Sequence, residues 1–293
     1  MRFWTPLLVT TAACTTLISA APTASTISVL AQPEVDGLKP YAHLAAAAYH
    51  SLTQWDCAHC AFVPNTRLEY FFATPGDATV GYVATNADMK TIIVAFRGSR
   101  SIAQWITNLV FVPVDWPPKV DDSKVHLGFL TSYHTVADRV YDKVTELLKA
   151  NPDYSISLTG HSLGGALSSV AAVDFARRDS ALVPKLNVVT FGKPRVGNIK
   201  YAAYYNSLNI RTTRVVNKAD IVPHLPLFTI ADYTHEQGEV WIQTSNAGGK
   251  TVRCASVNNE ENRDCSYKVD MLLTKIPDHM WAWDVFMLDR LSP

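Results

Sequence analysis

The stretch Thr159-Gly160-His161-Ser162-Leu163-Gly164-Gly165 decides how the rest of the chain is interpreted. It follows a strand-like apolar run that ends at Leu158 and precedes a helix-like run of small residues that starts at Ala166. A Gly-x-Ser-x-Gly between a strand and a helix is typical of a nucleophile elbow, whose strained turn projects the serine Oγ clear of the backbone. The outer glycines lack Cβ atoms, so the strand and the helix can approach closely. A chance pentapeptide in a loop is the alternative, and the flanking runs favour the elbow, with Ser162 as the nucleophile.

Length and charge set broad limits on the protein. The chain has 293 residues, 48% of them hydrophobic, which is enough for one large core or at most two. Basic and acidic residues number 26 each, so the formal net charge is +0. No nucleic-acid partner is predicted, because no basic excess would attract one. The balance fits a neutral or interfacial substrate.

The N-terminus predicts export. Residues 1–20 have the pattern of a secretory signal peptide, with Arg2, an apolar stretch and small residues for cleavage. Residues 21–33 are predicted to be a short pro-segment or arm, and residues 34–293 a single domain. A membrane span is the alternative for the first segment, but its apolar run is short and broken by threonines. No later stretch is apolar enough to span a bilayer, so we expect a secreted, extracellular protein without a transmembrane segment.

Cysteine usage agrees with export. Cys14 lies in the predicted signal, which leaves Cys57, Cys60, Cys254 and Cys265. Four cysteines in an exported protein predict two disulfides, with three pairings open. Cys57 and Cys60 also have the spacing of a zinc-ligand pair, but Cys254 and Cys265 lack the matching close spacing. No thioredoxin-like pattern surrounds the first pair to support a redox role.

Strand-like and helix-like segments alternate along the chain. This alternation predicts an α/β fold with a mostly parallel central sheet flanked by helices. The helices are expected at Leu38–Ser51 and Gly128–Ala150, and Val252–Tyr267 is expected to be a polar loop. The strands are expected at Val80–Val83, Thr91–Phe96, Val188–Phe191, Arg214–Asn217 and Val240–Gln243.

The segment from Ser101 to Val112 is predicted to be an amphipathic helix without a charged residue. A core helix is the simple interpretation of its apolar stripe. A movable flap is favoured here because the helix directly follows a Gly-Ser turn and is flanked by prolines. The residues of the apolar stripe are Ile102, Trp105, Ile106, Leu109 and Val110.

A serine nucleophile needs a base, and the base needs an orienting acid. In hydrolase sheets that carry the elbow, the acid and then the histidine follow the serine in the chain. Asp220 is the preferred acid because it follows a buried strand, where open α/β sheets place ligand chemistry. His279 is the preferred base, since it lies in a loop that is expected to enter a terminal helix, and such a loop can carry its imidazole over the strand ends. His224, His235 and Asp278 are the weaker alternatives, and His235 is expected to be a structural hydrogen-bonding residue.

An oxyanion hole requires at least two donors aimed at one point. The N–H of Leu163, directly after the nucleophile, is expected to supply one donor. Ser99, in the turn after the Thr91–Phe96 strand, is expected to supply the second. A simple turn serine is the alternative for Ser99.

Several separate motifs resemble the secreted class 3 fungal lipases of the Rhizomucor/Rhizopus type. Besides the elbow they are Phe96-Arg97-Gly98-Ser99, Val125-His126-Leu127-Gly128-Phe129, Trp55-Asp56-Cys57-Ala58-His59-Cys60 and Asp220-Ile221-Val222-Pro223. The resemblance implies an α/β-hydrolase fold with a helical lid and a catalytic triad of Ser162, Asp220 and His279. It also implies an oxyanion hole at Ser99 and Leu163, local disulfides Cys57–Cys60 and Cys254–Cys265, and no metal or cofactor.

The expected function is that of a secreted serine esterase. It would hydrolyse acylglycerol esters at a lipid–water interface, as a triacylglycerol lipase and as a monomer. A mono- and diacylglycerol lipase remains open. A feruloyl-type esterase is disfavoured by the apolar flap, and a non-catalytic lipid-binding protein is disfavoured by the intact serine, aspartate and histidine.

Overall fold

The computed structural model describes residues 1, 27–108, 110–244, 249–256 and 261–288. The predicted signal peptide beyond Met1, residues 21–26 of the predicted pro-segment, and Leu109 of the flap lie outside the described residues.

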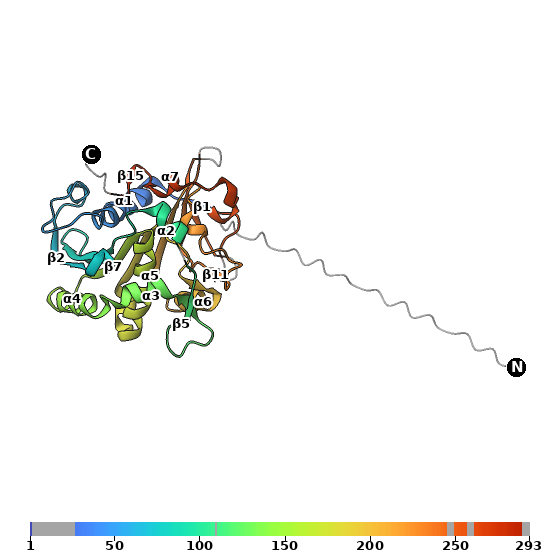
Figure 1. The fold of residues 1–293 in the computed structure, drawn as a ribbon, viewed down its shortest axis with the longest axis horizontal. Coiled ribbons are helices and arrows are strands. Elements are labelled where there is room, and N and C mark those ends of the chain that lie inside the picture. Colours follow the sequence, from blue (N-terminus) through green and yellow to red (C-terminus); the bar gives the residue numbers. More distant parts are fainter. Residues whose placement is uncertain (2–26, 109, 245–248, 257–260, 289–293) are drawn as a thin grey trace.

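In the described part of the chain, a nine-stranded sheet forms the centre of the molecule (Figure 1). Its five middle strands run parallel, and antiparallel strands extend it on both sides. The predicted α/β class is therefore confirmed. In spatial order the strands are β1 (Ile27–Val29), β13 (Thr251–Cys254), β12 (Glu239–Ile242), β10 (Arg211–Asn217), β8 (Leu186–Phe191), β7 (Ser155–His161), β4 (Thr91–Phe96), β3 (Val80–Asn86) and β2 (Thr66–Ala73).

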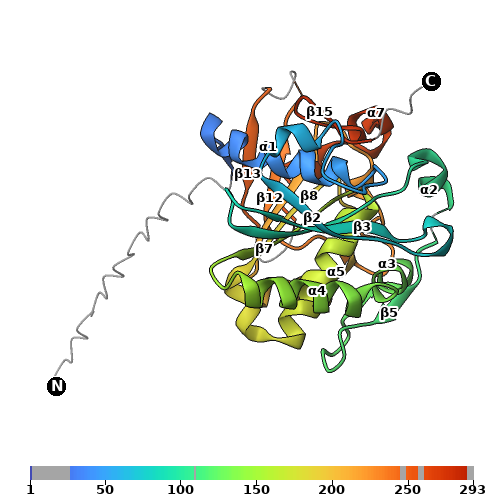
Figure 2. The ribbon, with the colours of Figure 1, turned by 90° about the vertical axis from the view of Figure 1, so that its left-hand side faces the viewer.

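Helices cover both faces of this sheet. The α-helices are α1 (Gln32–Ala47), α2 (Ile102–Asn108), α3 (Leu127–His134), α4 (Ala137–Ala150), α5 (Leu163–Arg178), α6 (Ile199–Ser207) and α7 (Ile276–His279). Figure 2 shows α1 on one face, α3, α4 and α5 on the other, and α2 beyond one end of the sheet. Short 3₁₀ turns are η1 (Cys60–Phe62), η2 (Pro75–Asp77), η3 (Ser180–Lys185), η4 (Val222–His224), η6 (Ser266–Lys268) and η7 (Met271–Leu273).

Two smaller sheets complete the described structure. One joins β11, β9, β6 and β5 in that order, and the other is a hairpin of β14 and β15. Their bounds are β5 (Pro113–Asp115), β6 (Lys124–His126), β9 (Gly197–Asn198), β11 (Tyr233–Thr234), β14 (Trp281–Ala282) and β15 (Val285–Phe286).

The core explains why the middle strands are uniformly apolar. β4 is buried along its whole length because α4 and α5 cover one face of the sheet and α1 the other. α5 can lie so close to the sheet only because Gly164 has no side chain. A methyl group there would lie 2.7 Å from the carbonyl carbon of Phe96.

Element positions agree with the sequence except at helix ends. The five predicted strands are present, and Thr91–Phe96 has the predicted bounds. The predicted Leu38–Ser51 helix begins earlier, as α1 at Gln32, because Pro33 suits a first turn and Glu34 Oε2 accepts a hydrogen bond from the Ala31 amide. The predicted Gly128–Ala150 helix was wrong as a single element. It breaks at Val136, whose backbone leaves the helical region (φ −126°, ψ −8°).

Three further predictions near the site were wrong. The flap helix α2 is described from Ile102 to Asn108, and Val110 to Val112 are not helical; the Val112 carbonyl instead accepts a hydrogen bond from the Leu127 amide. The predicted loop at Val252–Tyr267 begins as strand β13, paired with β1 and β12. The histidine at position 279 ends the short α7 and is followed by the β14–β15 hairpin instead of a terminal helix.

Candidate active site

Ser162 lies on the turn between β7 and α5. Its backbone has φ 59° and ψ −129°, a region that non-glycine residues rarely occupy, so the turn is strained as an elbow requires. Its amide donates to the Phe191 carbonyl at the end of β8, over 2.9 Å. The side chain is buried, and its Oγ has no hydrogen-bond partner among the described residues.

The structure brings His279 and Asp220 together. His279 Nδ1 lies 2.9 Å and 3.0 Å from the two carboxylate oxygens of Asp220, and both side chains are buried. Since a carboxylate only accepts, Nδ1 donates the proton, and in the neutral form of the ring the lone pair is then on Nε2. His279 Nε2 is likewise buried without a hydrogen-bond partner in the described structure. Ser162 Oγ and His279 Nε2 are therefore not hydrogen-bonded to each other in this closed state.

The ends of three neighbouring strands hold these groups close to one another. Asp220 follows β10, and its loop is fixed to α7 because the Lys275 amide donates to the Ala219 carbonyl over 2.7 Å. Gly192, after β8, lies against both side chains. A methyl group there would be 2.7 Å from Asp220 Oδ2 and from His279 Nδ1.

His161 connects the elbow directly to the histidine of this pair. Its ring packs against the His279 ring with centroids 4.3 Å apart, and its Nε2 donates to the His279 carbonyl over 2.8 Å. Its Nδ1 must then accept, so the hydroxyl of Tyr49 donates to it over 2.8 Å. Burial holds the pKa of His161 well below its usual range, and the neighbouring His279 lowers it further. A neutral ring fits this hydrogen-bonded link.

Sequence reasoning did not assign a role to Tyr49 or His161. His161 lies inside the elbow motif, next to Ser162, so its position in the sequence could have indicated a role at the site. Tyr49 follows an alanine-rich helix, and nothing in the local pattern indicates that it reaches His161 across 112 residues of chain.

Ser99 and Leu163, the two expected oxyanion-hole residues, line the same cavity. Ser99 and Leu163 both line a cavity of about 460 Å³ between α2 and α3, and both also line an adjoining cavity of about 390 Å³. As the first residue of α5, Leu163 has an amide without an intrahelical acceptor. The turn carrying Ser99 reaches the elbow because its neighbour is Gly98. A methyl group at Gly98 would lie 3.0 Å from the Cβ of Ser162.

Helix α2 closes the site. Ile102 is buried, and Trp105 and Ile106 are half-buried in an apolar cluster with Tyr49, Val222 and Met280, around the loops that carry Asp220 and His279. Val110 is 71% exposed and lines the larger cavity. Three of the predicted flap residues thus pack inward over the site, Val110 lies at its edge, and Leu109 is outside the described residues.

The competing acid and base occupy other positions. Asp278 Oδ2 accepts a hydrogen bond from the Ala219 amide over 3.2 Å, whereas the imidazole of its neighbour His279 is hydrogen-bonded to Asp220. His235 Nε2 lies 2.9 Å from the Pro223 carbonyl, in the structural role expected for it. His224 is buried, which lowers its pKa, and it stands on the turn η4.

Both cysteine pairs are disulfides, Cys57–Cys60 and Cys254–Cys265. In the described structure, the group of three residues whose potential metal-ligand atoms lie close together is Glu239, Cys254 and Cys265. Its cysteines are bonded to each other, so they offer no thiolate to a metal. None of the described helices has the length and apolar character needed to cross a membrane.

The chain is similar to known lipases in sequence and in fold. A family model described as lipase (class 3) matches residues 93–230. The lipase of Rhizopus niveus is 38% identical over 258 residues, which cover 86% of this chain and 64% of the relative. The chain thus spans just under two thirds of that relative's length. The lipase of Rhizomucor miehei is 38% identical over 252 residues, covering 84% of this chain and 68% of the relative. The solved structure of the Rhizomucor miehei triacylglyceride lipase has a TM-score of 0.82 at 36% identity, covering 89% of this chain and 98% of the other.

Proposed function

The chain belongs to the class 3 lipase family, and from that membership we propose that it is a secreted serine esterase that hydrolyses acylglycerol esters at a lipid–water interface. Its fold is that of the α/β-hydrolases. One observation carries the proposal: a buried His279–Asp220 pair lies beside a strained serine turn, under an uncharged helix.

Hydrolysis would proceed in two half-reactions, and these three residues would act in both. Ser162 Oγ attacks the ester carbonyl while His279 Nε2 takes its proton, and Asp220 holds the Nδ1–H tautomer and stabilises the imidazolium. The imidazolium then protonates the departing glycerol oxygen. In the second half, His279 removes a proton from water, which attacks the acyl-enzyme and releases the fatty acid and Ser162.

The oxyanion of each tetrahedral intermediate would be stabilised by the amides of Ser99 and Leu163. Both residues line the same cavity, which is where the carbonyl oxygen would have to lie. Loss of one such donor typically raises the barrier by about 3 kcal/mol.

The flap would couple this chemistry to a lipid surface. In water, Ile102, Trp105 and Ile106 bury apolar area against the site. At an interface the same side chains can be buried in lipid instead, and each buried aliphatic or aromatic side chain contributes about 2 kcal/mol. Opening would also let Ser162 Oγ and His279 Nε2 adjust into hydrogen-bond distance, as catalytic pairs often do on binding substrate.

Triacylglycerol is the proposed substrate because the structural relative from Rhizomucor miehei is a triacylglyceride lipase. Secretion and a monomeric state belong to the same proposal. The N-terminal pattern and the two disulfides support secretion, and the monomeric state stays a prediction.

The test compares hydrolysis of tributyrin, triolein, monoolein and methyl ferulate by the unchanged protein and by Ser162→Ala. Ser180→Ala, at an exposed serine beyond α5, is the control. We expect the triacylglycerols to be hydrolysed, Ser162→Ala to be inactive and the control to match the unchanged protein. Full activity in Ser162→Ala would reject the serine mechanism. Hydrolysis of monoolein or methyl ferulate alone would reject the triacylglycerol assignment.

A further inference from the structure

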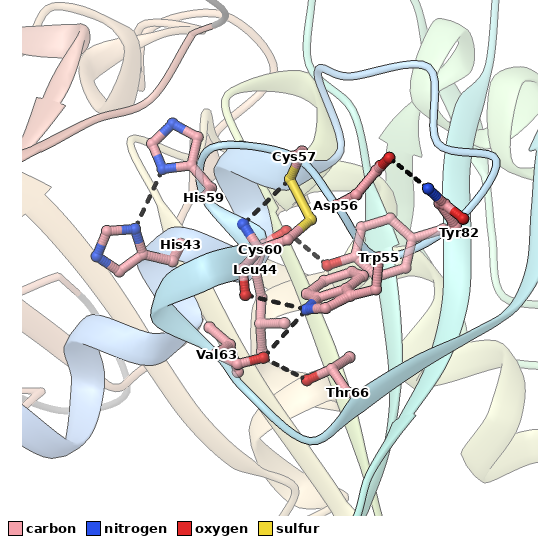
Figure 3. Close-up of a disulfide and its surroundings, with 11 residues drawn as sticks. His43, Leu44, Trp55, Asp56, Cys57, His59, Cys60, Val63, Thr66 and Tyr82 are labelled. Atoms are coloured by element: carbon pink, nitrogen blue, oxygen red, sulfur yellow. Dashed lines mark hydrogen bonds between the residues drawn. A yellow bond between two sulfur atoms is a disulfide. The ribbon is translucent and has the colours of Figure 1, made fainter.

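Two histidines meet at the surface, away from the active site. His43 stands on α1 and His59 directly precedes η1, and their Nδ1 atoms lie 3.1 Å apart. Figure 3 shows the two rings turned toward each other beside the Cys57–Cys60 disulfide. Both residues are half-buried, so solvent can reach the pair.

This distance has a chemical consequence. Two Nδ1 atoms that are hydrogen-bonded share one proton, so at least one of them already presents a lone pair. Two imidazole nitrogens bound to one tetrahedral Zn²⁺ at 2.0–2.1 Å are separated by about 3.3 Å. The 3.1 Å separation is close to this value, so a metal ion can replace the shared proton once both rings tilt to aim their lone pairs at one point.

Packing around the two rings holds them in this arrangement. Phe62 stacks on His43 with centroids 4.2 Å apart and planes within 9°. The loop that carries His59 is fixed from inside, since Trp55 Nε1 donates to the carbonyls of Cys60 and Val63 over 3.1 Å and 3.0 Å. Preorganised ligands lose little entropy when a metal binds.

We propose that His43 and His59 bind one divalent transition-metal ion, Zn²⁺ or Cu²⁺, through their Nδ1 atoms, and that this ion ties α1 to the disulfide loop. The disulfide links residues only three apart, so it closes the loop on itself and does not attach it to the helix. A metal bridge between His43 and His59 would provide that attachment. The site is separate from catalysis and does not depend on the proposed function.

The local charges are compatible with a cation. Lys39 is close to His43, but its ammonium is paired with the Asp284 carboxylate over 3.0 Å. Imidazole is a preferred ligand of zinc and copper among the divalent metals.

The test is calorimetric titration of Zn²⁺ into the metal-free full chain. We expect one equivalent to bind, His43→Gln and His59→Gln each to weaken binding by about tenfold or more, and His134→Gln to bind as the unchanged chain. His134 is an exposed histidine on α3 and serves as the matched control. Zn²⁺ should also raise the melting temperature of the unchanged chain and of His134→Gln by more than that of the other two variants.

A second measurement keeps the test independent of how the variants fold. With ¹⁵N-labelled histidine in the unchanged chain, Zn²⁺ should shift the Nδ1 resonances of two residues together at one equivalent. A far-UV circular dichroism spectrum and a cooperative thermal transition like those of the unchanged chain would show that the variants are folded. Absence of stoichiometric binding, or binding unaffected by both glutamine substitutions, would overturn the proposal.

Discussion

Two carboxylates stand near the catalytic histidine candidate, and they make different contacts. Asp220 hydrogen-bonds the imidazole of His279, whereas Asp278 caps the Ala219 amide. We expect Asp220→Asn to lower kcat roughly 10⁴-fold, because an amide can leave the imidazole in the wrong tautomer, while KM changes little. Asp278→Asn keeps an oxygen that can accept from Ala219 and should stay near the unchanged rate. Tributyrin hydrolysis by both variants checks this, and equal losses would contradict the assignment.

At the residue scale, the catalytic residues that the sequence predicted are those whose role is indicated by their neighbours in the sequence. Ser162 could be predicted because the elbow needs its glycines within two positions, and Asp220 because it follows a buried strand. The preference for His279 over His235 was an inference about loops, and the structure places only His279 against a carboxylate. The His43–His59 pair could not be predicted, because it depends on how a loop packs on a helix.

At the element scale, α1 supports the elbow from the opposite face of the sheet. Tyr49, just after α1, donates to His161, which in turn holds the His279 carbonyl. Tyr49→Phe leaves the buried His161 Nδ1 without a donor, and we expect a stability loss of about 1–3 kcal/mol together with a fall in kcat at unchanged KM. Burial raises the pKa of Tyr49, so the hydroxyl stays a donor throughout the working pH range.

Tyr82→Phe is the matched control for this positioning role. Its buried hydroxyl donates to the Leu44 carbonyl over 2.7 Å, far from the triad in the chain. Its removal should cost similar stability but leave kcat unchanged. Denaturant unfolding measures the stability of both variants, and ester hydrolysis measures their kcat. An equal fall in kcat for the two variants would mean that Tyr49 has only a structural role.

The flap helix α2 gives a second prediction at this scale. Ile102 is buried against the site, and Ala103 beside it is exposed. Ile102→Ser removes about 2 kcal/mol of burial from the closed state, which corresponds to about thirtyfold in the closed-to-open equilibrium. The ratio of tributyrin activity above its solubility limit to activity below it should therefore fall. Ala103→Ser should preserve the ratio, and a ratio unchanged in Ile102→Ser would argue against a flap.

The periodicity of the apolar residues did not predict where the helices begin and end. An apolar stripe continues from α3 through Val136 into α4, so the sequence predicts one helix. The break arises where Thr135 Oγ1 bonds back to the Ser132 carbonyl over 2.6 Å and Val136 turns into the core. Such competition between side-chain and backbone hydrogen bonds is decided by packing, which a single sequence does not reveal.

At the scale of the whole molecule, buried ion pairs tie together the loops behind the site. Lys193, just after β8, is 0% exposed and lies 3.0 Å from Glu236, which is 1% exposed. Arg195 pairs with Glu261 and also donates to the His224 and Pro226 carbonyls. These contacts connect the end of β8 to the loop that follows Asp220, so they can influence how firmly the catalytic groups are held.

The Lys193–Glu236 pair gives a prediction for stability. Lys193→Met leaves a buried carboxylate without its partner, and the free energy of unfolding should fall by about 3–5 kcal/mol. Lys193→Met combined with Glu236→Gln should recover most of this loss, since glutamine can still accept the hydrogen bond that Ser169 Oγ donates over 2.9 Å. Guanidinium unfolding at neutral pH measures all three proteins, and a double variant as unstable as the single one would contradict the argument.

The pH dependence of the free energy of unfolding tests the same ion pair through its carboxylate, Glu236. Burial alone would raise the pKa of Glu236, but the charges of Lys193 and Arg214 bring it below its usual 4.5. A carboxyl whose folded pKa is depressed stabilises the protein above its unfolded pKa and loses that contribution as pH falls through the folded value. The unfolding free energy of the unchanged chain should therefore drop more steeply below about pH 4.5 than that of the double variant. Parallel pH profiles for the two proteins would mean that Glu236 is not the group whose charge the fold depends on.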